Sequence, residues 1–294
     1  LIRNPKGFNW DFSFNASLVH NKIIKLPYNG NENNRQGGTQ VFDPKTQQVI
    51  WVGGYQEGHT MGDIYAYKQV KILSDWNEVN TMAGNYIDMI AGLYGPNVSD
   101  ADKKKYGLTK PIEPGDVLWA DLDGNHKIDQ LDRVKVGNIY PKWTGGFSTT
   151  LSYKNVSLYG RFDFALGHTI LNMVAMRSLG QSVGFKNIIK EGLKTWTEEN
   201  TNTDLPKSYY DDSTNKKNIY RDTKGSDITS VNDRSSRFYE KGDYLALREL
   251  TLNWKLPVNW ISKVGMTNAS VYITCQNLFY ITGYSGSSPE APLT

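Results

Sequence analysis

The sequence has few of the residues that crosslink a chain or bind a transition metal. It holds one cysteine, Cys275, in 294 residues, which excludes an internal disulfide bond. Its four histidines are scattered and lack metal-ligand spacing: His20, His59, His126 and His168. A run of about eighteen apolar residues is also absent, so no transmembrane helix is predicted.

Charge is balanced, and catalytic motifs are lacking. The chain carries 33 basic and 30 acidic residues, a net charge of +3, and no basic cluster or arm, which argues against nucleic-acid binding. The G-x-S-x-G, H-E-x-x-H, P-loop and C-x-x-C motifs do not occur. A carboxylate pair for glycoside hydrolysis needs only the right separation in space, so it stays open, but no pair is indicated. We expect a protein that is not an enzyme.

Aromatic residues and glycine are abundant instead. The chain holds 18 Tyr, 8 Trp, 10 Phe and 27 Gly, which suits strands and turns better than a helical bundle. The mean hydropathy is negative, at -0.54. A membrane barrel is compatible with that value, because every second residue of its wall is polar.

Two alternating segments, 147–153 and 156–166, predict a long hairpin with a tight turn at Lys154-Asn155. Successive side chains of a strand point to opposite faces, so the hairpin has an apolar and a polar face. The apolar face carries Phe147, Leu151, Tyr153, Val156, Leu158, Phe162, Phe164 and Leu166. The polar face carries Ser148, Thr150, Ser152, Ser157, Tyr159, Arg161 and Asp163. This pattern is typical of a barrel wall between lipid and water, so we predict a transmembrane antiparallel β-barrel.

Other segments fit the same wall. Residues 8–18 alternate over a length that crosses a tilted barrel, which takes about 9 to 11 residues. Residues 244–256 slip phase between Leu247 and Leu250, and a β-bulge near Arg248-Glu249 would repair the slip. Residues 269–276 alternate again, whereas 47–52 and 64–72 are weaker candidates.

Two long stretches interrupt the strands. Apolar residues between Trp76 and Leu93 recur at helical spacing, which predicts a helix in a loop over 74–113. Within 168–237, the residues Ile188, Ile189, Leu193 and Trp196 predict a short helix. Outer-membrane barrels have long outer loops and short periplasmic turns, so the long stretches should face outward and Lys154-Asn155 the periplasm.

An acidic twelve-residue loop spans 121–132 and has the oxygen spacing of a calcium loop. The predicted ligands are Asp121, Asp123, Asn125, the Lys127 carbonyl, Asp129 and Asp132. Two departures weaken the match: His126 stands where a glycine with positive φ is usual, and position 12 is Asp rather than Glu. An Asp/Asn-rich turn held by its own hydrogen bonds is the alternative.

Several ordered motifs resemble one family. They are G-F-N-W-D-F-S-F-N at 7–15, M-G-D-I-Y-A-Y at 61–67, D-x-D-G-N-x-K-I-D-x-x-D at 121–132, R-V-x-V-G-N-x-x-P-K-W-T-G-G-F at 133–147, W-T-E-E-N-T-N-T-D-L-P at 196–206, S-S-R-F-Y-E-K-G-D-Y-L-A-L-R-E-L-T-L-N-W at 235–254 and Q-N-L-F-Y-I-T-G-Y-S-G at 276–286. Together they resemble the C-terminal half of SusC/RagA-type TonB-dependent outer-membrane transporters of the Bacteroidetes. The order of the motifs is more specific than any one of them.

The resemblance implies a fragment, over 1–294, of the C-terminal part of such a transporter. It implies about ten strands of a plugged barrel of about 22 strands, with short helices in long extracellular loops. No signal peptide, plug domain, TonB segment or terminal aromatic strand is recognised, so both ends are expected to be truncated. The implied function is energised uptake of oligosaccharides or peptides, with a SusD-like lipoprotein, TonB-ExbB-ExbD and outer-membrane lipid as partners.

The polar face of the wall predicts residues along the substrate path. Tyr159, Arg161, Asp163 and Glu249 should project into the lumen, together with Lys255. The alternative is that such residues pair with one another or with a plug. Aromatics at strand ends are expected in the interfacial girdles: Trp143, Tyr153, Trp254 and Tyr280.

Two other protein classes stay open. A soluble carbohydrate-binding β protein with a dockerin-like calcium loop would share the acidic loop and the aromatic content. A carbohydrate-active enzyme is the other alternative, and hydrolysis of a glycan by the isolated protein would support it. Either would bury its apolar strand faces in a dry core.

Overall fold

The computed structural model describes residues 2–4, 7–179, 190–208, 219–221, 228–230 and 235–290. The chain forms two compact units. The first combines Leu1–His20, Ile139–Ile170 and Lys241–Thr294, and the second combines Asn21–Asn138 and Leu171–Glu240. Each unit has its own sheets.

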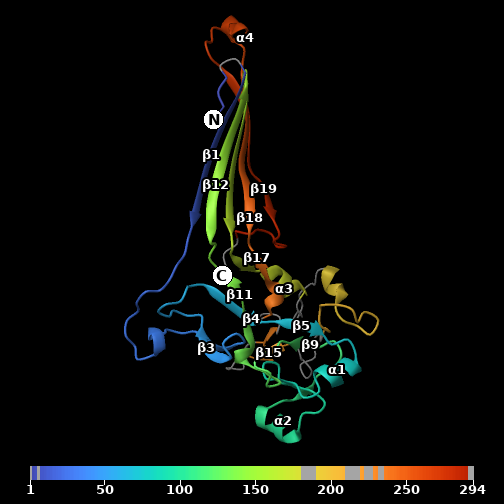
Figure 1. Cartoon of the computed structure of the whole chain (residues 1–294). Coiled ribbons are helices and arrows are strands. Elements are labelled where there is room, and N and C mark those ends of the chain that lie inside the picture. The colour runs from blue at the N-terminus through green and yellow to red at the C-terminus, as the bar shows by residue number, and fades with distance from the viewer. Residues whose placement is uncertain are drawn as a thin grey trace. The chain divides into compact units, whose positions relative to one another are not determined.

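One antiparallel sheet of five long strands dominates the first unit (Figure 1). In spatial order its strands are β1 (Phe8–Leu18), β12 (Trp143–Tyr153), β13 (Val156–Leu166), β18 (Tyr244–Lys255) and β19 (Ser270–Thr282). They have 11 to 13 residues each, enough to cross a tilted barrel wall. The long strands predicted from alternation are therefore confirmed, as is their antiparallel pairing.

The register brings the apolar residues of all five strands onto one face. Phe147 pairs with Phe14 on one side and with Phe162 on the other, and the rings of Phe147 and Phe162 stack 4.5 Å apart. This face stays exposed, with Phe14 at 59% and Ile273 at 66% of full exposure. Within the described residues of the first unit, the five long strands form one sheet. The sheet is thus unlike the layers of a soluble β-sandwich.

The predicted β-bulge lies at Arg248. Neighbouring residues Arg161 and Phe162 of β13 pair with Glu249 and Leu247, which leaves Arg248 without a partner in the register. The register with β19 shifts at the same place. A bulge sets two residues of one strand opposite one of its neighbour. Arg248 therefore joins Glu249 on the polar face, and the apolar alternation resumes at Leu250.

The two ends of the sheet differ. At one end Lys154-Asn155 form a tight turn, with Lys154 in the left-handed region at φ 53°. At the same end the β18–β19 connection carries α4 (Val258–Ile261) and the 3-10 helix η6 (Ser262–Val264). Both long connections, 19–142 and 167–243, leave and rejoin the sheet at its other end.

The strands described in the second unit are short, of two to six residues. Its small sheets are β2 (Thr39–Asp43) with β3 (Gln48–Val52), β4 (Asp63–Tyr67) with β11 (Arg133–Asn138), β5 (Gln69–Ile72) with β9 (Val117–Trp119), β15 (Ile219–Arg221) with β16 (Ile228–Ser230), and β10 (Lys127–Ile128), β6 (Ile87–Asp88), β7 (Leu93–Tyr94) and β8 (Lys110–Pro111) together. A further pair joins β14 (Thr169–Leu171) to β17 (Tyr239–Lys241).

The expected strand number needs correction. In the described part of the chain the wall has five strands rather than about ten. The weaker candidates at 47–52 and 64–72 do form strands, β3, β4 and β5. They are too short to cross a bilayer, which takes about 9 to 11 residues, and they pair within the second unit.

Helices of the second unit are short as well. They are α1 (Trp76–Met82), α2 (Asp100–Tyr106), α3 (Met173–Leu179) and the 3-10 helices η1 (Glu32–Asn34), η2 (Gln130–Asp132), η3 (Lys190–Lys194) and η5 (Ser236–Phe238). The helix predicted from Trp76 towards Leu93 is correct only as far as Met82, because the chain then turns into the β6–β7 hairpin. The helix predicted around Leu193 is the 3-10 helix η3, while Ile188 and Ile189 lie outside the described residues.

The second unit has its own apolar core. Its buried members include Tyr67, Ile72, Leu73, Val79, Ala83, Tyr86, Leu93, Ile112, Val117, Leu118, Trp119, Ile128 and Trp196. Inside this core the Tyr86 hydroxyl bonds to both the N–H and the carbonyl of Trp119. Among the described residues, no helix is both long and apolar enough to cross a membrane.

Candidate functional site

The polar face of the long sheet carries a hollow of about 450 Å³. It is lined by Ser13, Asn15, Gly145, Gly146, Phe147, Ser148, Tyr159, Arg161, Phe162, Asp163 and Arg248. Gly146 lets the backbones approach closely, because a Cβ there would meet the Phe162 carbonyl at 2.6 Å. Most of the lining residues have polar or charged side chains, as expected of a wall that faces water.

Arg248 organises the charges beside this hollow. Its guanidinium contacts both carboxylate oxygens of Asp163, with Nη2 at 2.9 Å from Oδ2, and it also binds Glu290. The Tyr280 hydroxyl accepts from Arg248 at 3.2 Å and donates to Glu290 at 2.7 Å. Arg248 therefore connects three strands and the segment after β19. A bidentate pair of this kind fixes orientation as well as charge.

The structure places all four predicted lumen residues on the polar face. Tyr159, Arg161 and Asp163 line the hollow. Glu249 lies next to them, 4.0 Å from the Arg161 guanidinium, and its carboxylate accepts from Thr251. At least two of the four are thus paired with neighbouring side chains. Contact of any of them with substrate stays a prediction.

Sequence reasoning missed Arg248 and misplaced Tyr280. The sequence predicts a bulge at Arg248, and the side chain of Arg248 is not among the predicted lumen residues. A bulge that restores the apolar phase must nevertheless send the side chains of both its residues to the polar face. Tyr280 is not in a girdle, because it pairs with Ala246 and bonds to Arg248 on the polar face. Trp143, Tyr153 and Trp254 do lie at strand ends on the apolar face, each at least 40% exposed.

The acidic loop folds into a compact turn in the second unit. Carboxylate oxygens of Asp121, Asp123 and Asp132 lie within 4.8 Å of one another. Asp121 accepts the N–H groups of Gly124 and His126, and Asp132 accepts those of Leu122 and Asp129. Hard oxygen ligands in such a cluster fit a calcium ion.

The remaining predicted ligands of the loop stabilise its backbone. Asn125 accepts from Lys127 N–H at 2.7 Å, and Asp129 accepts from Leu131 N–H at 2.7 Å. His126 takes the left-handed conformation of the usual glycine, at φ 61°. Ile128 is fully buried in the core, and its strand β10 pairs with β6. The loop therefore brings three carboxylates together and also forms many internal hydrogen bonds.

Burial changes the protonation of this region. It raises the pKa of Asp132 to about 6, against the opposing effect of two backbone N–H donors. Burial also raises the pKa of Asp123, and the nearby carboxylate of Asp121 adds to that rise. Such a cluster costs free energy when all its members are ionised, and a divalent cation would remove that cost.

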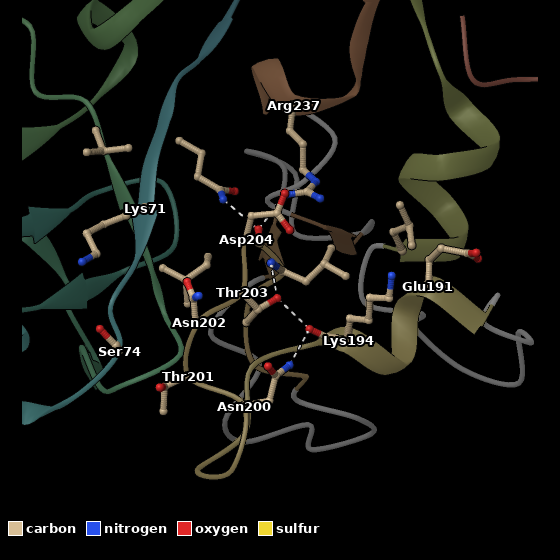
Figure 2. Close-up of a pocket in the computed structure, with 15 residues that line it drawn as sticks. Lys71, Ser74, Glu191, Lys194, Asn200, Thr201, Asn202, Thr203, Asp204 and Arg237 are labelled. Carbon is tan, nitrogen blue, oxygen red and sulfur yellow. Dashed lines mark hydrogen bonds and ion pairs between the residues drawn. The ribbon is translucent and has the colours of Figure 1, made fainter.

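A larger hollow, of about 810 Å³, lies in the second unit between β5, η3 and the segment 200–205 (Figure 2). The Arg237 guanidinium holds Asp204 at 2.8 Å, and the Lys194 carbonyl accepts from Thr203 and Asn200. Its lining combines cationic, anionic, hydroxyl and amide groups. Such a surface offers many donors and acceptors to a polar ligand.

Comparisons with known proteins agree with the fold. No family model matches the chain. TonB-dependent receptor P3 of Formosa agariphila is 30% identical over 286 residues, which are 97% of this chain and 24% of that protein. TonB-dependent receptor SusC of Bacteroides thetaiotaomicron is 23% identical over 297 residues, 97% of this chain and 22% of that protein. The solved structure of the RagAB peptide transporter matches 98% of this chain and 25% of its own, at a TM-score of 0.58 and 22% identity.

Over nearly its whole length the chain is similar to SusC/RagA-type TonB-dependent receptors. It spans about a quarter of the length of these relatives. This similarity agrees with the long antiparallel sheet as part of a barrel wall. The relatives reported above are named as receptors and a transporter, so the soluble and enzymatic alternatives are not favoured.

Proposed function

We propose that the full-length SusC/RagA-type receptor imports nutrients through the outer membrane of a bacterium. This chain would supply five wall strands and part of the outward loops. The observation that carries the proposal is the sheet with two unlike faces: exposed aromatic and aliphatic side chains on one, a charged and hydroxyl-rich hollow on the other. Hydrocarbon and an aqueous lumen account for both faces at once.

The substrate class proposed is an oligosaccharide or a peptide. The solved neighbour RagAB is titled a peptide transporter, which supports the peptide. The hollow of the second unit suits either class, because both present amide or hydroxyl groups at close spacing. On the polar face of the wall, the substrate would contact Tyr159, Arg161, Asp163 and Glu249.

The proposed partners follow from the SusC/RagA type. A SusD-like surface lipoprotein would bind the outward loops of the receptor. A TonB-ExbB-ExbD complex would supply energy through a TonB segment, and a plug domain would close the barrel. The TonB segment and the plug domain would belong to other parts of the full-length receptor. The proposed role is transport without catalysis.

Calcium is proposed as a structural ion of the acidic loop. Asp121, Asp123 and Asp132 would hold it through carboxylate oxygens, with Asn125, the Lys127 carbonyl and Asp129 completing the set. The convergence of three carboxylates supports this assignment. The ion would fix the loop against β6 and thereby stabilise the second unit.

Uptake by living cells tests the proposed function. Deletion of the receptor gene should abolish uptake of one class of labelled oligosaccharides or peptides, and deletion of TonB should have the same effect. The full-length gene should restore uptake, and the protein should fractionate with the outer membrane. Unchanged uptake of every labelled glycan and peptide, or recovery of the protein in the aqueous fraction without detergent, would contradict the proposal.

A further inference from the structure

The connection between β18 and β19 exposes an unusual number of apolar side chains. We name residues 254–268 the β18–β19 foot. Val258, Trp260, Val264 and Met266 are 62, 60, 69 and 53% exposed, whereas Ile261 is buried at 5%. A periplasmic turn of a barrel is normally short, and exposed apolar side chains grouped in this way mark an interaction site.

The foot is continuous with the apolar face of the sheet. Trp254, at the end of β18, lies on that face and pairs with Val156 and Val271. The Trp260 ring meets the Trp254 ring edge-on, at 5.9 Å and 87°. At its base, Lys255 N–H bonds to the Asn155 carbonyl and Leu256 N–H to the Ala269 carbonyl. The environment that surrounds the apolar face therefore extends to the edge of the foot.

The charges of the foot have one sign. Lys255 and Lys263 lie within 254–268, and this segment holds no Asp or Glu. The adjacent turn adds Lys154, whose ammonium lies 5.2 Å from the Tyr153 ring centre. Tryptophan, tyrosine and lysine together are typical of the headgroup level of a membrane, where rings lie at the boundary and ammonium groups reach the phosphates.

We propose that the β18–β19 foot inserts into the phospholipid headgroup boundary of the leaflet at the Lys154 end of the barrel. Val258, Trp260, Val264 and Met266 would enter the acyl boundary, as interfacial helices do to a depth of about 5–10 Å. Lys255 and Lys263 would bind anionic headgroups. The foot thereby fixes the depth of the wall in the bilayer. This inference rests on the membrane placement in the proposed function.

Fluorescence quenching of the full-length receptor in vesicles tests the foot. A bimane label would be placed at Val264→Cys in a Cys275→Ser background, with other cysteines of the receptor replaced by serine. The vesicles would contain phosphatidylcholine and phosphatidylglycerol, brominated either near the headgroup or near the methyl end of the chain. We expect a larger loss of fluorescence with bromine near the headgroup, and protection from aqueous iodide. Lys255→Gln with Lys263→Gln should reduce the loss in phosphatidylglycerol vesicles more than in pure phosphatidylcholine.

A label on native Cys275 separates this inference from the proposed function. Cys275 is exposed in the middle of β19 and pairs with Leu250 on the apolar face. Its label should lose most fluorescence to bromine near the methyl end. If Cys275 is quenched by bromine and Val264 only by iodide, the foot is in water, and the inference fails while membrane placement stands. Protection of Val264 from both quenchers would indicate a protein partner and would also overturn it. Iodide quenching at Cys275 and at Val264 would refute the inference on the foot and the membrane placement together. A label at Asp100→Cys on α2, whose native carboxylate is 97% exposed, serves as the aqueous reference.

Discussion

At the scale of residues, Arg248 holds several charged and polar side chains of the polar face together. Its side chain is 20% exposed and contacts Asp163, Glu290 and Tyr280 together. Asp163 and Glu290 would be two neighbouring carboxylates without that cation. The bulge thus places the guanidinium of Arg248 on the polar face, where regular alternation would have sent this side chain to the opposite face. Charge and planarity both matter here, because a lysine offers no second parallel hydrogen bond.

Arg248→Lys should lower the free energy of unfolding of the full-length receptor by about 1–3 kcal/mol, because it loses charge-assisted hydrogen bonds that are partly shielded from water. Urea unfolding in vesicles measures the effect. Arg161→Lys is the matched control, since Arg161 is 58% exposed and 4.0 Å from Glu249. It should cost less than about 1 kcal/mol, as exposed pairs do. Equal effects of the two variants would show that Arg248 is no organising residue.

Asp88 makes a buried part of the second unit sensitive to pH. It is 2% exposed, and burial raises its pKa to about 6, with Asp116 adding to the rise. The unfolded chain releases this proton at a pH of about 3.9, so the folded form binds more protons between the two values. The contribution of Asp88 to the free energy of unfolding is therefore complete below a pH of about 4. It is lost as the pH rises through about 6, and the loss is up to about 3 kcal/mol.

Asp88→Asn should remove this pH dependence. The variant keeps the Oδ1 acceptor for the N–H groups of Ile90 and Ala91, both at 2.9 Å. Hydrogen exchange of the amides over 86–94, corrected for intrinsic rates, should be alike in both proteins near pH 4 and slower in the variant near pH 7. The same pH profile in both proteins would exclude Asp88 as the cause.

At the scale of elements, alternation predicted strands well and apolar spacing predicted helices poorly. The five long strands follow from their sequences because one face of each is apolar and the other polar, and that pattern has period two. Residues 76–93 carry apolar side chains at intervals of three and four, as a helix would. Tyr86, Ile87 and Leu93 are nevertheless buried from the β6–β7 hairpin and the residue before it, not from a helix. Gly92, at φ 72°, turns this hairpin. Tertiary packing decided between two structures that the spacing alone could not separate.

The candidate site was predictable to a similar degree. Period two places Tyr159, Arg161, Asp163 and Glu249 on one face, but it cannot show which of them pair. The hollow of the second unit joins β5 to residues more than a hundred positions later, and no local pattern connects them. The exposure of Trp260 also needed the structure, because the sequence predicts only the strands on either side of it, over 244–256 and 269–276.

Calcium should stabilise the acidic loop as a unit. Addition of Ca²⁺ to chelator-treated receptor should slow hydrogen exchange of the amides over 121–132, because the ion would hold three carboxylates in place. Asp123→Asn should abolish the response while its remaining oxygen still accepts from Asn125 N–H. Asp100→Asn, at an exposed acid on α2, should respond as the native protein does. Equal exchange with and without Ca²⁺ in the native receptor would leave the loop as a hydrogen-bonded turn.

At the scale of the molecule, the two faces of the long sheet suit two different environments, one apolar and one aqueous. The apolar face would be unfavourable in water, since Phe12, Phe14, Ile273 and Ile281 are each more than half exposed. The polar face would be unfavourable in hydrocarbon, since it holds Arg161, Asp163 and Arg248. A closed barrel in a membrane satisfies both faces and also pairs the open edges of β1 and β19.

A matched pair of lysine substitutions on β1 tests this claim most directly. Phe12 is 52% exposed on the apolar face, and Ser13 follows it on the polar face. Urea unfolding of the full-length receptor in vesicles should show a loss of about 2–4 kcal/mol for Phe12→Lys, because a charge then lies in hydrocarbon. Ser13→Lys should cost less than about 1 kcal/mol, because its ammonium stays in the aqueous lumen. If Phe12→Lys costs no more than Ser13→Lys, the exposed aromatic face meets water, and the membrane wall is refuted.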